Sequence, residues 1–201
     1  MKNKTIVVAS SNNGKLNEIR KIFNDYEVMS IKDMEEKLGK KIIVKEEQDT
    51  FEANALEKVR DLYNQVGEEY ICIGDDSGIS IDILKGFPGV YTARWMDASD
   101  HIKNIELLKK VGNVSKDKRT CHYTTVIALK SKDFEKTFSY TLDGFVSNSV
   151  RGENGFGFDE IFELENGLTL AELSTEDKLA ISPRRKTLEM VDTFVNESKE
   201  F

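Results

Sequence analysis

The chain has few of the residues that build metal centres and covalent frameworks. Its 201 residues include only two histidines, two cysteines and two prolines. Cys72 and Cys121 lie far apart in the sequence, so we expect neither a disulfide framework nor a zinc site from them. Two histidines are also too few for a histidine-rich metal centre. This cysteine usage is typical of a reducing compartment, so we expect a cytoplasmic protein.

Long apolar runs are also missing. No stretch approaches the roughly 18 apolar residues of a membrane span, and the apolar run Ile6–Ala9 is too short for a signal peptide. Acidic residues outnumber basic ones by 36 to 29, which gives a net charge of −7. That balance argues against a general nucleic-acid-binding surface. We therefore expect no membrane and no nucleic-acid partner, while a local basic pocket for one small anion stays open.

The sequence has no repeat, no low-complexity linker and no clear boundary, so we expect one domain over residues 1–201. Strands are predicted at Thr5–Ala9, Lys41–Val44, Tyr70–Gly74, Ile79–Ile83, Cys121–Leu129 and Thr137–Leu142, the last two as a hairpin. Helices are predicted with Lys15 in the first turn, from Asp49–Thr50, over His101–Lys110, after Ser174 and around Leu188–Val195. Because strands and helices do not alternate strictly, the pattern favours a mixed sheet flanked by helices over a doubly wound fold.

A polar turn, Ser10–Lys15, connects the first strand to the first helix. A strand, a polar turn and a helix N-terminus in that order make a natural anion site. The turn is not a P-loop, because that motif needs Gly five residues before Gly14 and Ser or Thr after Lys15, where this chain has Ala9 and Leu16. The alternative is that Lys15 is an ordinary surface lysine.

Two adjacent carboxylates, Asp75 and Asp76, end a predicted buried strand, where they are costly unless a positive group is near. In a strand they would point to opposite faces, but a turn at Asp75–Gly78 could bring both onto one cation, and magnesium prefers such oxygen ligands. The alternative is a solvated turn. Asn54 and Lys58 lie four apart on a predicted helix, so they can point together at something beside the core.

Two late segments could bind a flat, anionic ligand. The segment Gly155–Asp159 places two aromatic residues between glycines, so the backbone could approach a ring while an aromatic side chain stacks on it. The alternative is a strand bulge with two core aromatics. The basic residues Lys178, Arg184, Arg185 and Lys186 could hold phosphates, or they could form an ordinary solvated run.

Four blocks, in this order, resemble the inosine triphosphate pyrophosphatase family from Val7 to about Leu188. They are Ser10–Lys15, similar to T/S-x-N-x-x-K; Thr50–Lys58, similar to T-F-x-E-N-A-x-x-K; Asp75–Gly78 with Gly86–Arg94, similar to D-D-S-G and G-x-P-G-x-Y-S-A-R; and Gly155–Phe162, similar to G-F-G-Y-D-P-I-F. Each block alone is moderately specific, but four in sequence are hard to obtain by chance.

The resemblance implies a fold and a reaction. The fold would be an elongated α/β structure, a mixed sheet flanked by helices with a central cleft between two lobes, commonly as a homodimer. The reaction would be Mg²⁺-dependent cleavage of aberrant purine nucleoside triphosphates (ITP, dITP, XTP) between the α and β phosphates, giving a monophosphate and pyrophosphate. The rivals are the same chemistry with relaxed base choice, and a nucleotide-binding regulator without turnover.

The resemblance also implies roles by position. Glu46, Asp75 and Asp76 would hold magnesium, and Asp76 would activate the attacking water. The substrate would contact Ser10, Asn12, Lys15, Asn54, Lys58, Ser77, Phe156, Gly157, Phe158, Asp159, Lys178 and Arg184. These roles agree with the physics, because an anionic triphosphate must be neutralised by cations before phosphoryl chemistry can proceed.

The chain departs from the family in the half of the site that selects the base. The family's K-N-x-x-S-H-R stretch is matched by Lys178–Arg184, where Leu179 replaces Asn and Pro183 replaces the base-reading His. Proline has no side-chain donor and no backbone N–H. Ala53 and Glu160 replace a family Glu and Pro. We therefore expect weaker discrimination between inosine or xanthosine triphosphates and the ordinary purines than the family shows.

Overall fold

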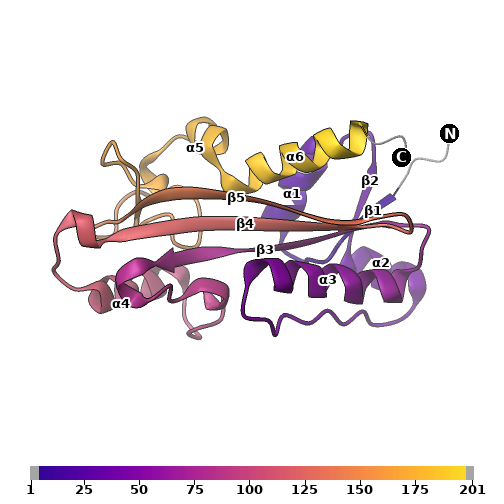
Figure 1. The fold of residues 1–201 in the computed structure, drawn as a ribbon, viewed down its shortest axis with the longest axis horizontal. Helices are drawn as coiled ribbons and strands as arrows, with labels where there is room; N and C mark the ends of the chain where they lie inside the picture. Colours follow the sequence, from indigo (N-terminus) through magenta and orange to yellow (C-terminus); the bar gives the residue numbers. More distant parts are fainter. Residues whose placement is uncertain (1–4, 198–201) are drawn as a thin grey trace. The chain divides into compact units, whose positions relative to one another are not determined.

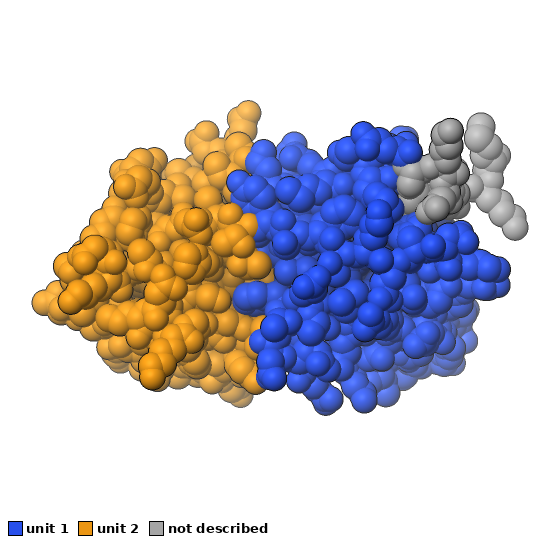
Figure 2. Space-filling view, viewed as in Figure 1, with its two compact units in different colours: residues 1–76, 125–140, 184–201 blue, residues 77–124, 141–183 orange. Residues whose placement is uncertain are grey.

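The computed structural model describes residues 5–197, which fall into two compact units (Figures 1 and 2). Of these described residues, unit 1 comprises residues 5–76, 125–140 and 184–197, and unit 2 comprises Ser77–Thr124 and Thr141–Pro183. Three long strands, β3 (Ile71–Ile81), β4 (Thr120–Lys130) and β5 (Glu135–Val146), contribute residues to both units. The expectation of one domain with a central cleft stays a prediction.

The strands form one mixed sheet in the order β2-β1-β3-β4-β5-β6. β1 pairs in parallel with both β2 and β3, whereas β5 pairs antiparallel with β6. The other elements are β1 (Thr5–Val8), α1 (Asn13–Ile22), β2 (Glu27–Ser30), α2 (Ile31–Leu38), α3 (Phe51–Val66), α4 (Asp100–Val111), β6 (Phe162–Glu163), α5 (Thr175–Ile181) and α6 (Pro183–Glu197). The prediction of a mixed sheet flanked by helices is confirmed.

In unit 1, helices cover both faces of the sheet. Ile71 and Ile73 of β3 pack in a buried cluster with α1 and α6. Cys72, between them in the chain, packs in a second cluster with α2 and α3 on the other face. This alternation follows from the two-residue period of a strand, and it determines which way the next residues of β3 point.

The core of unit 2 is built around the second half of β3. Ile79 and Ile81 are fully buried and cluster with Leu107 of α4, Tyr123 of β4 and Phe162 of β6. The strand predicted over Ile79–Ile83 is confirmed only to Ile81, because Asp82–Leu84 form a short 3-10 turn in which Ile83 is exposed. Helix α4 lies where the helix over His101–Lys110 was expected.

The structure differs from the sequence analysis in several local features of unit 1 and β3. Asp75–Gly78 is not a turn, because β3 continues without interruption from Ile71 to Ile81. β2 and α2 were not anticipated, since β2 spans only four residues and begins with an exposed glutamate. The helix predicted from Asp49–Thr50 is α3, and its N-cap is Thr50, whose side chain accepts a hydrogen bond from the Ala53 amide at 3.1 Å.

The segment Lys41–Val44 was predicted to be a strand, but the structure shows that it is not one. Side chains of α3 accept hydrogen bonds from the backbone amides of residues 43–48, in place of a neighbouring strand. The four pairs are Gln65 with Ile43 at 3.0 Å, Asp61 with Lys45 at 2.9 Å, Glu57 with Glu47 at 2.9 Å and Asn54 with Gln48 at 2.9 Å. Successive turns of α3 therefore fix this segment, and with it Glu46.

Candidate functional site

The polar turn after β1 is held in place by its own side chains. Asn12 is the N-cap of α1, and its Oδ1 accepts hydrogen bonds from the amides of Gly14 at 2.9 Å and Lys15 at 3.2 Å. Ser10 Oγ accepts one from the Asn12 amide at 3.1 Å. This capping places Lys15 in the first turn of α1, as the sequence predicted.

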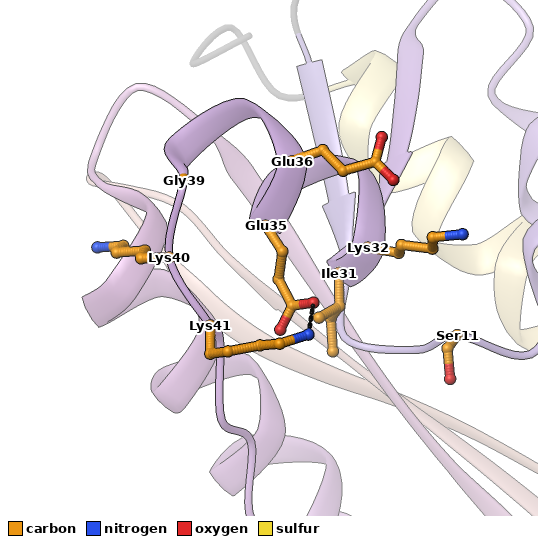
Figure 3. Close-up of a pocket in the computed structure, with 8 residues that line it drawn as sticks. All are labelled: Ser11, Ile31, Lys32, Glu35, Glu36, Gly39, Lys40 and Lys41. Atoms are coloured by element: carbon orange, nitrogen blue, oxygen red, sulfur yellow. Dashed lines mark hydrogen bonds and ion pairs between the residues drawn. The ribbon is translucent and has the colours of Figure 1, made fainter.

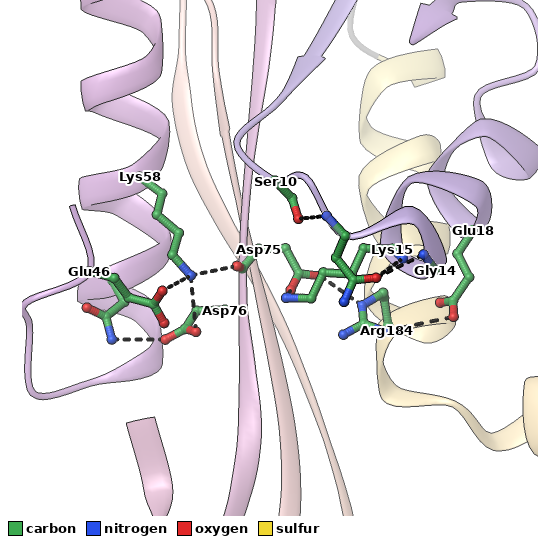
Figure 4. A network of polar contacts seen from close by, with 11 residues as sticks. Ser10, Gly14, Lys15, Glu18, Glu46, Lys58, Asp75, Asp76 and Arg184 are labelled. Carbon is green, nitrogen blue, oxygen red and sulfur yellow. Dashed lines mark hydrogen bonds and ion pairs between the residues drawn. The ribbon is translucent and has the colours of Figure 1, made fainter. Parts of the chain in front are cut away.

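Asp75 continues the face of β3 that carries Ile71 and Ile73, so it points toward α1 and α6 (Figure 4). Its carboxylate forms ion pairs with Lys15 and, at 2.9 Å, with Nε of Arg184 at the start of α6. Burial alone would raise the pKa of Asp75, but the charges of Arg184 and Lys15 outweigh it and hold the pKa below its ordinary value.

Glu18 extends this group. Its Oε1 lies 3.8 Å from Nη1 of Arg184. Sequence reasoning did not single out Glu18, although its position three residues after Lys15 on the same helix face was a usable signal. The side chains of Asp75 and Arg184 are 0% and 3% exposed, so this charge network is held in the interior.

Asp76 lies on the opposite face of β3, toward α3. The close approach of α3 depends on Gly74, because a Cβ there would overlap the backbone of Ala55 and lie 3.1 Å from the amide of Val59. Asp76 accepts a hydrogen bond from Nδ2 of Asn54 at 3.0 Å and forms an ion pair with Lys58 at 3.3 Å. The prediction that Asn54 and Lys58 point together beside the core is therefore confirmed.

Glu46 joins this second group. Its carboxylate lies 3.1 Å from Nζ of Lys58, which also donates a hydrogen bond to the backbone oxygen of Asp75 at 3.1 Å. Burial raises the pKa of Asp76 to about 6; Lys58 opposes this rise and Glu46 adds to it. A carboxyl group with that pKa is mostly ionised at neutral pH and is a stronger base than an ordinary aspartate.

The carboxylates fit a metal ion in part. Among residues 5–197, no group of three or more His, Cys, Asp or Glu side chains is arranged to hold one, and Asp75 lies on the other face of β3 from Glu46 and Asp76. Glu46 and Asp76 contact a single lysine, and magnesium usually takes only one or two carboxylates and completes its shell with substrate phosphates and water. The Glu46 and Asp76 pair therefore suits magnesium bound together with a phosphate ligand.

The loop of residues 155–160 in unit 2, here called the aromatic loop, presents one of its two rings to solvent. Phe156 is 53% exposed, and Nζ of Lys178 on α5 lies 4.8 Å from its ring centroid. Lys178 also forms an ion pair with Asp159, which accepts a hydrogen bond from the Phe156 amide at 2.7 Å. Phe158 is half-buried and packs edge-on against Tyr123 of the unit 2 core at a centroid distance of 4.8 Å.

The predicted site residues fall into both units. Unit 1 holds Ser10, Asn12, Lys15, Glu46, Asn54, Lys58, Asp75, Asp76 and Arg184. Unit 2 holds Ser77, Phe156, Gly157, Phe158, Asp159 and Lys178. In unit 1, side chains from separate elements contact Asp75 on one face of β3 and the pair Asp76 and Glu46 on the other. In unit 2, Lys178 and the Phe156 amide contact Asp159. Ser77 follows Asp76 in β3 and is half-buried.

A shallow groove of about 650 Å³ lies beside the polar turn in unit 1 (Figure 3). It is lined by Ser11, Ile31, Lys32, Glu35, Glu36, Gly39, Lys40 and Lys41. Its cations are partly balanced, since Lys41 forms an ion pair with Glu35 at 2.9 Å. None of the predicted site residues lines this groove, so we keep it apart from the candidate site.

Comparisons with known proteins show which family and which fold this chain resembles. The model of the Ham1 family matches residues 6–194. A protein of Caldanaerobacter subterraneus subsp. tengcongensis named dITP/XTP pyrophosphatase is 39% identical, with 91% of this chain and 92% of that protein covered. One of Campylobacter concisus with the same name is 35% identical over 97% and 98%. The structure of the Staphylococcus aureus Ham1 protein matches with a TM-score of 0.86 at 36% identity, over 96% and 98% of the two chains.

The comparisons bear out the sequence resemblance and the α/β fold class. In the part of the chain that the structure describes, no helix is both long and apolar enough to cross a membrane.

Proposed function

This chain belongs to the Ham1 family, and we propose that it is a nucleoside triphosphate pyrophosphatase that removes aberrant purine nucleotides from the nucleotide pool. Its substrates would be ITP, dITP and XTP, and its products a nucleoside monophosphate and pyrophosphate. The names of its relatives support this proposal. The observation that carries it is the division of charge at one point of β3, with cations gathered around Asp75 and carboxylates around Lys58.

The cations on the Asp75 face would bind the triphosphate. Lys15 stands in the first turn of α1, beside a polar turn whose amides are already ordered by Asn12. Arg184 begins α6 and is fixed by Asp75. A triphosphate carries several negative charges, and phosphoryl transfer depends mainly on positioning and electrostatic stabilisation of those charges. Ordered cations therefore supply much of what the reaction needs.

Asp76 would act as the general base. It would take a proton from a water molecule whose oxygen forms the new bond to the α phosphorus. The bond from that phosphorus to the bridging oxygen breaks, and its electron pair leaves with pyrophosphate. The raised pKa of Asp76, about 6, suits this role because proton transfer is most effective when the pKa of the base lies near the working pH.

Magnesium is the cofactor we propose, held by Glu46 and Asp76. Asp75, which the family resemblance also predicts as a ligand, points to the other face of β3 and is paired there with Lys15 and Arg184, so we do not place it among the ligands. When bound, the ion would neutralise phosphate charge and polarise the phosphoryl oxygens. Lys58 already contacts both Glu46 and Asp76, so it would keep these carboxylates together and help to balance the negative charge of the phosphates.

The aromatic loop would bind the base. The exposed ring of Phe156 offers a stacking surface, while Lys178 and Asp159 place a donor and an acceptor beside it. Stacking does not distinguish one purine from another. Pro183, the first residue of α6, brings no side-chain donor where the family has His. This observation favours the second candidate, the same reaction with relaxed base choice.

We also propose that the protein works in the cytoplasm as a homodimer, without a nucleic-acid partner. The acidic charge balance supports the last point.

The test is pyrophosphate release from a panel of nucleoside triphosphates with magnesium. We expect release from ITP, dITP and XTP with a higher kcat/KM than from ATP and GTP. Equal values for all five would support relaxed base choice. Binding without any release would support the regulator instead and would refute the proposal.

A further inference from the structure

Helix α4 contacts the aromatic loop at its central glycine. Oδ2 of Asp100 accepts a hydrogen bond from the Gly157 amide at 2.9 Å, and Nδ2 of Asn104 donates one to the Gly157 carbonyl at 2.8 Å. Asp100 and Asn104 are four residues apart in α4, so they lie on one face of the helix. Both backbone polar groups of one loop residue are therefore held by the first turns of one helix.

Gly157 has no side chain with which to anchor itself. Its φ is +64°, a left-handed conformation in which other residues are strained, and nothing lies within 4 Å of the position that a Cβ would take. Asn104 is 1% exposed. The cavity between α4 and residues 157–158 measures only about 20 Å³, room for roughly one water molecule. The loop therefore rests directly on α4.

Glu160 strengthens the contact. One of its carboxylate oxygens accepts a second hydrogen bond from Nδ2 of Asn104 at 3.0 Å, and it lies 3.1 Å from Nδ1 of His101. Glu160 stands where the family resemblance predicts proline, which could accept no such bond through its side chain. Asn104 thus joins two points of the loop in this chain.

We propose that Asp100 and Asn104 form a clamp on Gly157 that positions the aromatic loop, and hence the exposed ring of Phe156, for binding the purine base. The two residues are positioning residues: they act on the base through Gly157, which is bonded directly to Phe156. The inference rests on the proposed function only for the identity of the ligand. The clamp itself is a property of unit 2 and can be measured without any nucleotide.

The first experiment measures the clamp by hydrogen exchange of the Gly157 amide in the full chain. Asp100 is exposed and lies at the helix start, so its variants should fold. Asp100→Ala removes the acceptor, whereas Asp100→Asn keeps an acceptor oxygen and removes only the charge. We expect exchange at Gly157 to rise about tenfold or more in Asp100→Ala and to stay near wild type in Asp100→Asn. Unchanged exchange in Asp100→Ala would overturn the clamp.

The second experiment measures what the clamp does, by steady-state kinetics with ITP. The loss of one hydrogen bond predicts a rise in KM of about two- to tenfold in Asp100→Ala, with kcat changed by less than about twofold. Asp100→Asn should restore the KM. His101→Ala is the matched control: it removes the contact with Glu160 and leaves both bonds to Gly157, so its KM should stay near wild type.

The outcomes separate the two proposals. If wild type releases no pyrophosphate from any triphosphate, the proposed function fails, and the exchange experiment still decides the clamp. Faster exchange in Asp100→Ala with unchanged KM would overturn the positioning role. Asn104→Asp removes the donor and places a second carboxylate beside Glu160, so it should loosen the loop more than Asp100→Ala does; tighter protection there would also overturn the clamp.

Discussion

Asp75 and Asp76 are neighbours in the chain, but they lie in opposite electrostatic surroundings. Asp75 and Glu18 face Lys15 and Arg184, so two carboxylates meet two cations. On the other face of β3, Asp76 and Glu46 share Lys58, so two carboxylates meet one cation. Burial acts to raise the pKa of both aspartates. The two cations outweigh it at Asp75, whose pKa is lowered, whereas at Asp76 the single cation does not, so the pKa of Asp76 is raised.

Because neighbouring side chains of a strand point to opposite faces, Asp75 and Asp76 can have different roles. The balanced face holds fixed cations in the interior and suits structure and phosphate binding. The face of Asp76 carries one more negative charge than positive among the three groups named, and a divalent cation would relieve that repulsion. The predictions below separate the two faces.

Removal of magnesium should have the largest effect. We expect pyrophosphate release to fall to background in excess chelator and to return when magnesium is added, because phosphate charge is then no longer neutralised. Glu46→Gln should raise the magnesium concentration needed for half-maximal rate, whereas Asp75→Asn should leave it unchanged. A raised requirement in Asp75→Asn would place Asp75 among the ligands, and full activity in chelator would refute the metal mechanism.

Asp76→Asn should have the next largest effect. Removal of a general base typically lowers turnover by about 10²- to 10⁴-fold. The carboxylate of Asp76 uses one oxygen for Lys58 and the other for Asn54, and the amide keeps only one acceptor oxygen, but Glu46 still pairs with Lys58. We therefore expect a folded protein with a modest loss of thermal stability, and calorimetry should still detect nucleotide binding. Turnover near the wild-type rate would show that Asp76 is not the base.

The sequence predicted the residue types of this site better than their arrangement. The alternation of Ile71, Cys72 and Ile73 already implied opposite faces for the two aspartates, but the polar run Asp75–Gly78 is typical of a turn. The run stays extended because partners from distant parts of the chain stabilise it: Lys15 and Arg184 on one face, Lys58 on the other. Local propensity contains no information on such partners.

The segment before α3 illustrates the same limit. The apolar residues of Lys41–Val44 predict a strand, yet its amides are bonded by polar side chains spaced along α3, such as Asp61 and Gln65. From the sequence alone, polar residues of α3 such as Asp61 and Gln65 are typical of the solvated face of a helix. In contrast, the helix start at Ser174 could be predicted from sequence, because a cap depends on contacts within one turn.

Asp75→Asn should mainly affect stability. Removing one partner of a buried ion pair usually costs about 3–5 kcal/mol, because it leaves buried charge uncompensated. We expect urea unfolding to show a loss of this size. Glu189→Gln is the matched control, since it breaks the exposed pair with Arg185 at 2.9 Å, and such helix pairs contribute only about 0.3–0.5 kcal/mol. Equal losses in both variants would remove the distinction between the faces.

Pro183→His should have the smallest effect. It tests whether a residue next to Arg184, on the face of β3 that carries Asp75, takes part in selecting the base. Pro183 precedes Arg184 and is buried at the first position of α6. A histidine there could donate a hydrogen bond to the 6-oxo group of hypoxanthine, which adenine lacks, and one net hydrogen bond corresponds to about a two- to tenfold effect.

We therefore expect the ratio of kcat/KM for ITP over ATP to be above one but modest in wild type and to rise by about two- to tenfold in Pro183→His. Pro183→Ala separates loss of the proline ring from gain of the donor, and it should leave the ratio unchanged. A high ratio in wild type that neither substitution alters would mean that selectivity resides elsewhere, with Lys178 and Asp159 beside the ring of Phe156 as the groups that carry it.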